Sequence, residues 1–579
     1  MKKNVFFLLS FSKGKNLDLT FMSATPWLDY YPEGIPHEID MDQYQSILEL
    51  FEECIKKYGD SSAYENMGKS ISFNQLDQLS TQFASFLQNE AGLSKGDRIA
   101  IQMPNLLQYP IAMFGALRAG MVVVNTNPLY TAREMEHQFK DSGASAIVIL
   151  ANFAFNLEKV LKQTQIKTVI ITELGDLLGG LKGSLVNFVV KRIKKMVPRY
   201  HINGAIKFKE AMALGKSSSY SRPEIEASDI AFLQYTGGTT GVSKGAMLLH
   251  RNIIANMQQI SAWMQPKLKE NEEIMITALP LYHIFALTVN CLAMLKIGAK
   301  NVLITNPRDM PAFIKELNRY PFSVVTGVNT LFNGLLNQPD FAKVDFSKMK
   351  VSVGGGMAVQ RVVAEKWEEV TGVPLAEGYG LTESSPTLTC NPIDGTEQIG
   401  TIGLPLPSTW IKICDENNQE LPIGEVGELY AKGPQIMAGY WQRPGETEKT
   451  MDGEWLKTGD IAKMDERGFF AIVDRKKDMI CVSGFNVYPN EVEDVVVSHP
   501  KVLEVAAIGV ADPKSTEAVK IFVVKKDTSL NEKELKEFCR ENLTGYKCPK
   551  HIEFREELPK SNVGKILRRL LTEEETSSN

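Results

Sequence analysis

A loop rich in glycine and threonine that ends in a lysine is the most specific chemical signal in this sequence. Glycines let a ligand approach the backbone, threonines supply hydroxyl groups and the lysine supplies positive charge, so this composition suits a polyphosphate better than a plain surface loop. The spacing is not that of a P-loop, because Ser243 directly precedes the lysine. The loop residues are Thr236, Gly237, Gly238, Thr239, Thr240, Gly241 and Lys244.

Four further residues are candidates for chemistry because of the segments around them. They are His283 after Pro280-Leu281-Tyr282, Glu383 after Tyr379-Gly380-Leu381-Thr382, Asp460 after Thr458-Gly459, and Lys565 after Gly564. Each has an ordinary structural alternative: a core histidine, a helix-entry glutamate behind a capping threonine, a strand-end cap and a solvated lysine.

In this order along the chain, these segments resemble those of the acyl-adenylate-forming superfamily, which includes acyl-CoA synthetases, peptide-synthetase adenylation domains and luciferases. The resemblance covers residues 30–572 and is strongest to the bacterial long-chain fatty acyl-CoA synthetases. It implies a ligase that uses ATP, Mg2+ and coenzyme A and releases AMP and pyrophosphate.

The resemblance also implies a role for each segment. Lys565 would bridge the carboxylate and the α-phosphate, Glu383 with Thr236 would hold Mg2+, and His283 would line the acyl pocket. Lys477 would be the hinge of a small C-terminal domain. The implied nucleotide- and coenzyme-binding residues are Thr236, Gly237, Gly238, Thr239, Thr240, Gly241, Lys244, Gly355, Gly356, Glu377, Gly378, Tyr379, Gly380, Thr382, Asp460, Arg475, Lys477 and Gly484.

The proposed chemistry requires two anions to meet, because a carboxylate must attack the α-phosphorus of ATP. Cations are needed where charge accumulates, and Lys565 and Mg2+ would supply them. In the second step the coenzyme A thiolate attacks the acyl carbon. Lys565 would then be in the way, so we expect the C-terminal domain to rotate about Lys477 and to present Gly484 to the pantetheine arm.

The identity of the acid is a weaker inference. Amino-acid adenylation domains place an aspartate in the stretch where this chain has residues 282–285, and an unpaired ammonium in an apolar pocket would be costly. Leu287 and residues 328–333 resemble fatty-acyl pocket positions, so a long-chain fatty acid is the expected substrate. Medium-chain or aryl acids, transfer to an acyl carrier protein, and a non-catalytic lipid- or nucleotide-binding relic remain alternatives.

The elements that must position these residues alternate between short β-branched runs and amphipathic stretches. Runs at 98–103, 146–150, 168–171, 274–277 and 301–304 predict buried strands, and stretches at 74–87, 131–140 and 312–320 predict helices. This alternation is typical of an α/β fold with mostly parallel sheets and helices on both faces. After about residue 405, short strands between Gly/Pro turns predict antiparallel, barrel-like structure.

These patterns predict three parts of the chain. Residues 1–21 are expected to be a disordered leader, since their apolar run is too short for a signal peptide. Residues 22–474 form the large domain, of which 406–474 is the barrel-like part. Residues 475–579 form the small, mobile α+β domain.

Composition limits the partners and the compartment. The 64 Lys and Arg residues nearly balance the 69 Asp and Glu residues, which disfavours nucleic acid. Seven scattered cysteines without a C-x-x-C pair point to a reducing compartment, so the cytoplasm is expected. Residues 183–199 could form a basic amphipathic helix, with Val186, Val189, Val190, Ile193 and Val197 on its apolar face, which leaves open peripheral attachment to the cytoplasmic face of the inner membrane. A homodimer also stays open.

Overall fold

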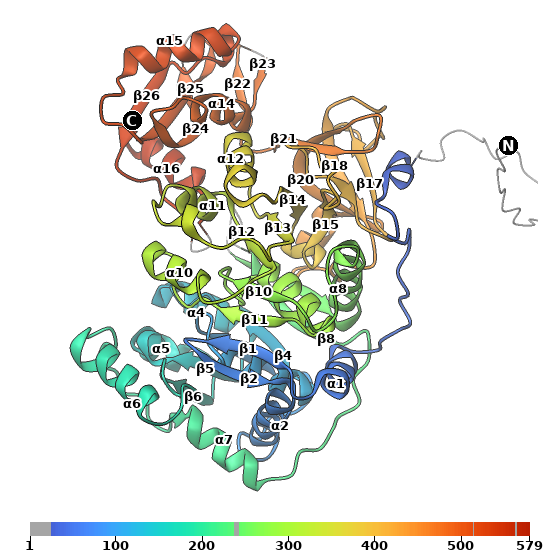
Figure 1. Ribbon diagram of the computed structural model, residues 1–579, viewed down its shortest axis with the longest axis vertical. Coiled ribbons are helices and arrows are strands. Elements are labelled where there is room, and N and C mark those ends of the chain that lie inside the picture. The colour runs from blue at the N-terminus through green and yellow to red at the C-terminus, as the bar shows by residue number, and fades with distance from the viewer. Residues whose placement is uncertain (1–24, 237–242, 484, 513–514, 562–563, 579) are drawn as a thin grey trace, which may run out of the picture.

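The computed structural model describes residues 25–236, 243–483, 485–512, 515–561 and 564–578. Among these residues the strands form four sheets, two mostly parallel and two mostly antiparallel. The predicted α/β class is confirmed. Figure 1 shows the C-terminal unit as a separate lobe at the top of the molecule, above the two parallel sheets and their helices.

The first parallel sheet ends in an antiparallel hairpin that carries the predicted phosphate loop. Its central strands are fully buried β-branched runs, as expected where helices cover both faces. At its edge β8 and β9 are antiparallel. In spatial order the strands are β7 (Ile206–Lys207), β6 (Thr168–Thr172), β5 (Ala146–Leu150), β3 (Arg98–Gln102), β4 (Val122–Asn125), β8 (Ile230–Thr236) and β9 (Lys244–Leu249).

The second large sheet carries glycine-rich segments at the ends of two neighbouring strands. β13 and β14 are parallel, so their carboxyl ends meet at one edge. In spatial order the strands are β16 (Leu404–Pro405), β15 (Thr387–Cys390), β14 (Leu375–Gly380), β13 (Val351–Gly354), β12 (Val324–Gly327), β10 (Ile274–Thr277), β11 (Lys300–Leu303), β1 (Ser62–Asn66) and β2 (Lys69–Ser72).

Helix ends follow their capping residues. The predicted helix at 131–140 is α4 (Ala132–Ser142), which begins after a capping box between Thr131 and Glu134 and ends at Gly143. The remaining helices of the two parallel layers are α1 (Ile47–Tyr58), α2 (Phe73–Asn89), α3 (Gln108–Arg118), α5 (Ala154–Val160), α6 (Gly180–Phe188), α7 (Phe208–Ser217), α8 (His250–Met264), α9 (Met294–Lys296), α10 (Met310–Leu317), α11 (Asn329–Leu336) and α12 (Arg361–Thr371).

The third sheet is antiparallel, as predicted for the region after residue 405. Its long strand β20 places Asp460 directly opposite Arg475 of β21. The elements are β17 (Trp410–Cys414), β18 (Gly427–Lys432), α13 (Pro444–Thr450), β19 (Met451–Asp452), β20 (Trp455–Met464) and β21 (Phe470–Arg475).

The C-terminal sheet is covered on both faces. Alternation along β24 and β25 sends Val505, Ala507 and Val523 to a core under α14 and α15, and Ile508 and Phe522 to a second core with α16. Its elements are β22 (Ile480–Val482), β23 (Phe485–Val487), α14 (Pro489–Val497), β24 (Val502–Asp512), β25 (Thr516–Lys525), α15 (Glu532–Asn542), β26 (His551–Arg555) and α16 (Arg568–Ser578).

The predicted boundary after residue 474 stays a prediction. Lys477 lies in the turn between β21 and β22, which belong to different sheets. The predicted leader, residues 1–21, falls outside the described residues. None of the described helices is both long and apolar enough to span a bilayer.

Candidate active site

The predicted phosphate loop joins the two strands of the β8–β9 hairpin. Thr236 ends β8 and pairs with Lys244 at the start of β9, and the Ser243 hydroxyl donates to the Thr236 carbonyl at 2.7 Å. The hairpin therefore fixes both ends of the loop. Gly237, Gly238, Thr239, Thr240 and Gly241 lie outside the described residues.

Lys244 lies between a carboxylate and an aromatic ring. Its ammonium is 2.6 Å from Glu446 Oε2 and 4.9 Å from the centre of the Tyr440 ring. Lys244 and Lys449 together lower the pKa of Glu446 to about 2, mainly through hydrogen bonds. These contacts hold the Lys244 side chain at the start of β9, where the loop ends.

Glu383, the predicted magnesium ligand, shares Tyr440 with Lys244. It lies in a short helical turn directly after β14, and its Oε1 accepts a hydrogen bond from the Tyr440 hydroxyl at 2.6 Å. This turn neighbours both β8 and β9. Mg2+ is commonly held by one or two carboxylates together with substrate phosphates, and a single oriented carboxylate beside the β8–β9 hairpin fits that pattern. Among the described residues, no three His, Cys, Asp or Glu side chains are grouped to hold a metal by themselves.

The predicted adenosine-binding residues meet at the carboxyl end of β14. The Tyr379 hydroxyl donates to Asp460 Oδ2 at 2.6 Å, and Arg475 Nε lies 3.3 Å from Asp460 Oδ1. Asp460 is only 4% exposed. The structure therefore brings together three residues separated by up to 96 positions in the sequence (379 and 475).

The glycines around β13 and β14 permit close packing at this edge. A Cβ at Gly380 would lie 1.9 Å from the Pro386 carbonyl oxygen, and one at Gly355 would lie 3.0 Å from that of Gly378. Glu377 accepts a hydrogen bond from the Val359 amide at 3.2 Å, and burial raises its pKa to about 8. Gly356 and Thr382 follow β13 and β14 in the adjoining turns.

His283 lies close to the catalytic lysine predicted from the sequence. Its Nδ1 accepts from the Phe285 amide at 3.3 Å, and burial together with the charge of Lys565 lowers its pKa to about 4. The imidazole is therefore neutral at physiological pH. The neighbouring side chains Phe285 and Leu287 are buried and apolar, as expected for a fatty-acyl site.

Lys565 reaches this site from the C-terminal unit on a tight hairpin. Ser561 donates its amide to the Lys565 carbonyl at 2.7 Å, and the Lys565 amide donates to Ser561 Oγ at 3.1 Å. Burial and the nearby Arg475 guanidinium lower the pKa of Lys565 to about 7, partly offset by Asp460. Lys565, Asp460 and Arg475 therefore share one environment.

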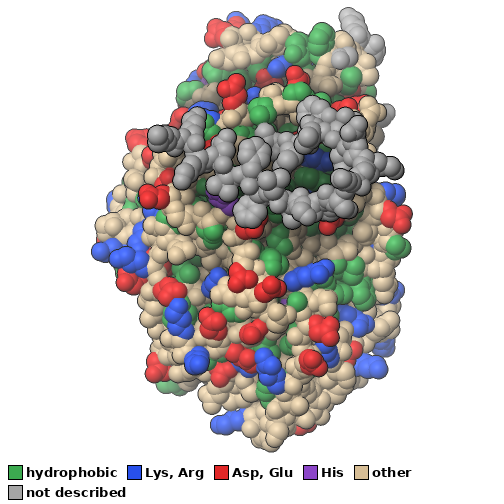
Figure 2. All heavy atoms as spheres, turned by 90° about the vertical axis from the view of Figure 1, so that its right-hand side faces the viewer, with side chains coloured by type: hydrophobic (Ala, Val, Ile, Leu, Met, Phe, Trp, Pro, Cys, Tyr) green, Lys and Arg blue, Asp and Glu red, His purple; other side chains and the backbone are tan. Residues whose placement is uncertain are grey.

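A cavity of about 560 Å3 opens beside this group. Its lining includes Glu383, Tyr440, Thr458, Gly459 and Lys476. On the face shown in Figure 2, acidic and basic side chains are interspersed over the lower body of the molecule.

Sequence reasoning missed three residues that the structure places in this network. Tyr440 contacts both Glu383 and Lys244, Glu446 pairs with Lys244, and Arg568 joins the lysine hairpin to the predicted hinge. No local pattern reveals them, because each acts on a partner at least 57 residues away.

Comparison with known proteins identifies the family of this chain. Residues 51–441 match the AMP-binding enzyme family, and residues 491–565 match the AMP-binding enzyme C-terminal domain. The chain belongs to the AMP-binding enzyme family. It is 59% identical over 548 residues to the long-chain-fatty-acid–CoA ligase of Escherichia coli O6:H1, covering 95% of this chain and 98% of that protein.

Two solved structures show the same fold. The ATP-bound MatB structure from Rhodopseudomonas palustris has a TM-score of 0.79 at 28% identity, covering 91% of this chain and 98% of that one. The anthranilate CoA ligase AuaEII in complex with anthranoyl-AMP has a TM-score of 0.83 at 23% identity, covering 93% and 99%. Each of these structures covers more than nine tenths of this chain, so the shared fold extends over both the main body and the C-terminal unit.

Proposed function

We propose that this AMP-binding enzyme joins a long-chain fatty acid to coenzyme A through an acyl-adenylate. The observation that carries the proposal is the position of Lys565. Gly564, directly before it, accepts a hydrogen bond from Thr330 of α11 at 3.0 Å, and the charge of Lys565 interacts with Asp460 and Arg475, where a nucleotide would bind, and with His283. A cation between an adenosine site and an acyl site suits the meeting of a carboxylate with a phosphate.

In the first step a fatty carboxylate oxygen attacks the α-phosphorus of ATP. The bond from the α-phosphorus to the bridging oxygen breaks, and pyrophosphate leaves with the electron pair. Lys565 stabilises the charge between the two anions, while Lys244 and the loop after Thr236 hold the leaving phosphates. Mg2+ held by Glu383, with Thr236, would neutralise phosphate oxygens.

In the second step the coenzyme A thiolate attacks the acyl carbon, and the acyl–phosphate bond breaks to release AMP. Asp460, Tyr379 and Arg475 continue to hold the nucleotide. The lysine hairpin has to leave the acyl carbon accessible, and the turn at Lys477 between two separate sheets is where that movement would occur.

Fatty acid is the substrate that the apolar surroundings of His283 and of residues 328–333 support best. Leu287, Leu331 and Phe332 are buried, and Phe332 packs against Trp367 at 4.6 Å between ring centres. In the same predicted segment, Thr330 and Asn333 instead contact the C-terminal unit. The 59% identity to a long-chain-fatty-acid–CoA ligase, over 95% of this chain, supports the same substrate class.

The test is acid-dependent exchange of labelled pyrophosphate into ATP, followed by coenzyme A thioester analysis. We expect exchange with palmitate and oleate, and thioester formation when coenzyme A is added. Activity with coumarate in place of fatty acids, or transfer to an acyl carrier protein in place of coenzyme A, would contradict the proposal.

We also propose that the enzyme docks on anionic membrane through α6 and the following π-helical segment Val189–Ile193. This helix projects from the side of the molecule (Figure 1). Its inward face is fixed by Asn187, which accepts from the Gly175 amide at 2.6 Å, and by the close approach of Gly183. Its outward face is apolar: Leu181 is 91% exposed, and Leu185 and Phe188 are also exposed.

This exposed face is not the valine face that the sequence predicted. Val186, Val189, Val190 and Val197 are half-buried, and of the predicted apolar set only Ile193 is exposed. The reason is that Gly183 and Asn187 set the rotation of the helix. The exposed cations Arg192, Lys194 and Lys195 follow directly, and apolar side chains flanked by cations match an anionic bilayer surface.

Vesicle sedimentation tests this docking surface. Leu181→Ser/Leu185→Ser/Phe188→Ser should weaken binding to phosphatidylcholine–phosphatidylglycerol vesicles by tenfold or more, since each buried Leu or Phe contributes about 1.5–3 kcal/mol. Lys194→Glu/Lys195→Glu should remove the dependence on phosphatidylglycerol. The matched control is Ile423→Ser/Val426→Ser, two side chains of 43% and 42% exposure elsewhere. Equal binding by all variants would overturn the surface.

A further inference from the structure

The side chain of Arg568 lies at the centre of a largely buried ionic cluster next to the lysine hairpin. It is the first residue of α16, three positions after Lys565. Its Nε and one terminal nitrogen donate to the two oxygens of Glu493 at 2.9 and 2.7 Å, and the same terminal nitrogen donates to Asn490. The Arg568 side chain is 19% exposed and Glu493 is 14% exposed.

The second terminal nitrogen of Arg568 reaches both sides of the predicted hinge. It lies 3.6 Å from Asp474 Oδ1 and 3.4 Å from Asp478 Oδ2. Lys477 stands between these two aspartates in the sequence. A rotation at Lys477 would therefore change the separation of the two contacts, since Asp474 precedes the hinge and Asp478 follows it.

Asp474 is held firmly on the side of the large unit. Its side chain is completely buried at the end of β21, directly before Arg475, which pairs with Asp460. Its Oδ2 also accepts from the Asn490 amide of α14 at 2.8 Å. Arg568 and Asn490 therefore both connect the C-terminal unit to the strand that carries the nucleotide-site arginine.

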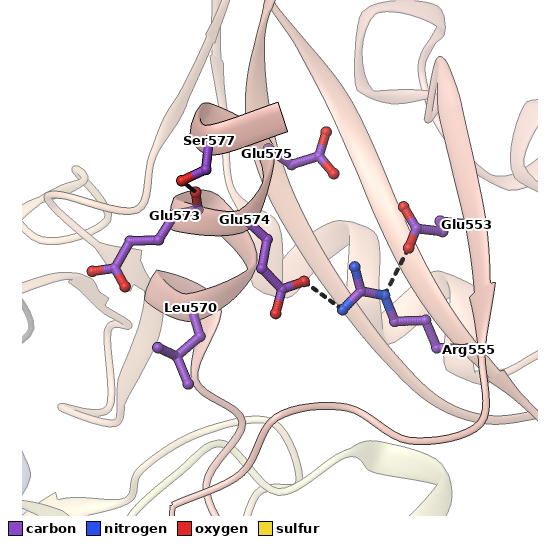
Figure 3. Close-up of a pocket in the computed structure, with 7 residues that line it drawn as sticks. All are labelled: Glu553, Arg555, Leu570, Glu573, Glu574, Glu575 and Ser577. Carbon is purple, nitrogen blue, oxygen red and sulfur yellow. Dashed lines mark hydrogen bonds and ion pairs between the residues drawn. The ribbon is translucent and has the colours of Figure 1, made fainter. Parts of the chain in front are cut away.

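The far part of α16 is anchored separately, so Arg568 is not needed to hold the helix on its sheet. Glu574 pairs with Arg555 of β26 at 2.7 Å, and Glu575 pairs with Lys520 of β25 at 2.5 Å. Figure 3 shows Arg555 between Glu553 and Glu574 at the shallow pocket beside this helix. Leu571 adds a fully buried contact.

We propose that Arg568 is a positioning residue. Its contacts with Asp474 and Asp478, called the clasp below, bridge the hinge and hold the Lys565 hairpin in its adenylation position. This inference rests on the proposed function, because it assigns Arg568 to one of its two half-reactions. Arg568 does not touch the reacting groups. It ties the base of the hairpin to Asp474, so that Lys565 stays beside Asp460 and Arg475 during the first step and is released when the clasp opens.

The experiment measures the two half-reactions separately in Arg568→Gln, with the full-length enzyme. We expect the rate of acyl-adenylate formation from oleate and ATP to fall by roughly tenfold to a hundredfold, as for loss of one partner of a buried charge pair. Thioester formation from supplied oleoyl-AMP and coenzyme A should stay within threefold of wild type. Arg568→Lys keeps the charge but loses the planar guanidinium that donates to two carboxylate oxygens at once. It should therefore recover only part of the adenylation rate.

Arg569→Gln is the matched control, since Arg569 is the next residue, is 52% exposed and pairs only within its helix among the described contacts, with Glu573 at 3.5 Å. It should behave as wild type. Asp478→Asn is a second variant that removes one clasp contact at a site 24% exposed, and it should lower adenylation selectively. Normal adenylation in both Arg568→Gln and Asp478→Asn, or equal loss of both half-reactions in folded variants, would overturn the clasp. Absence of adenylation in wild type would instead overturn the proposed function.

Discussion

The two halves of the candidate site are built in different ways. The nucleotide half, Tyr379, Asp460 and Arg475, comes from strands of the main body and is linked by contacts of 2.6 and 3.3 Å. The lysine half arrives on a hairpin from the C-terminal unit. Two hydrogen bonds from α11 join that unit to the main body: Thr330 to the Gly564 carbonyl at 3.0 Å, and Asn333 to the Leu503 carbonyl at 3.3 Å.

This difference shows how one site can serve two steps. A nucleotide has to stay bound through both half-reactions, so its side chains belong to packed strands. The cation is needed only while two anions meet, so it is delivered by a hairpin of the C-terminal unit and not by a strand of the body. Mutations in the two halves should consequently have different kinetic signatures.

The largest expected effect is that of Lys565→Ala. Adenylation should fall by about 10²–10³-fold, because the cation that offsets developing charge is lost. Thioester formation from supplied oleoyl-AMP should change little. Pyrophosphate exchange and single-step transfer assays measure the two rates, and equal loss of both would remove the distinction between the halves. Lys560→Ala is the control, since Lys560 lies on the same hairpin as Lys565 and pairs with Glu504 of β24.

Asp460→Asn should impair both half-reactions, because the nucleotide is present in each. Hydrogen bonds to a charged group contribute about 1.5–3 kcal/mol, so kcat/KM for ATP should fall by roughly 10–100-fold. The apparent affinity for oleoyl-AMP should fall in parallel. Asp452→Asn, an exposed aspartate on β19, serves as the control. An effect limited to adenylation would contradict the assignment of Asp460 to the nucleotide.

The pH dependence should also separate the two halves. Lys565 has a pKa lowered to about 7, so it is charged below that pH and neutral above it. We expect kcat/KM for adenylation to be level below about pH 7 and to fall by up to tenfold per pH unit above it. The rate of acyl transfer from oleoyl-AMP to coenzyme A should not show this fall above about pH 7, which is called the alkaline limb below.

Two other groups must be distinguished in that profile. His283 has a pKa lowered to about 4 and stays neutral across the range, whereas Glu377, with a pKa raised to about 8, titrates within it. In Lys565→Arg the guanidinium remains charged, so the alkaline limb should disappear. An unchanged alkaline limb in this variant would assign it to Glu377 instead.

The smallest expected effect is that of Thr330→Val, which removes one hydrogen bond between the two units. A hydrogen bond contributes about 0.5–1.5 kcal/mol, so adenylation should slow by roughly 2–10-fold while transfer stays unchanged. Thr330→Ser keeps the hydroxyl and should retain the wild-type rate. A rise in KM for oleate without a change in kcat would show that Thr330 belongs to the acyl pocket.

The sequence predicted the strands well because buried parallel strands are continuous apolar runs. The runs at 146–150 and 274–277 are β5 and β10, without a change in bounds. The predicted helix at 312–320 is shifted, since α10 begins at Met310 behind the cap of Asp309 and ends at Leu317. A capping side chain fixes the start of a helix by accepting from an amide two or three residues further on, whereas hydrophobic periodicity does not define where a helix starts.

Tertiary contacts decided which side of α6 faces the solvent. Periodicity defines a stripe on a helix but does not say which side faces the protein. Gly183 and Asn187 lie against the segment around Gly175, and this contact turns Leu181, Leu185 and Phe188 outward.

The sequence by itself determined the chemistry available: the phosphate loop, two acidic residues, a histidine and a C-terminal lysine, in a fixed order, together with the strands that carry them. Only the tertiary structure decided which of these meet and what holds them. Tyr440 donates a hydrogen bond to Glu383, and Arg568 pairs with Glu493, which precedes it by 75 residues in the sequence. Apolar runs are local properties of a chain, whereas the environment of a buried charge depends on every element that packs around it.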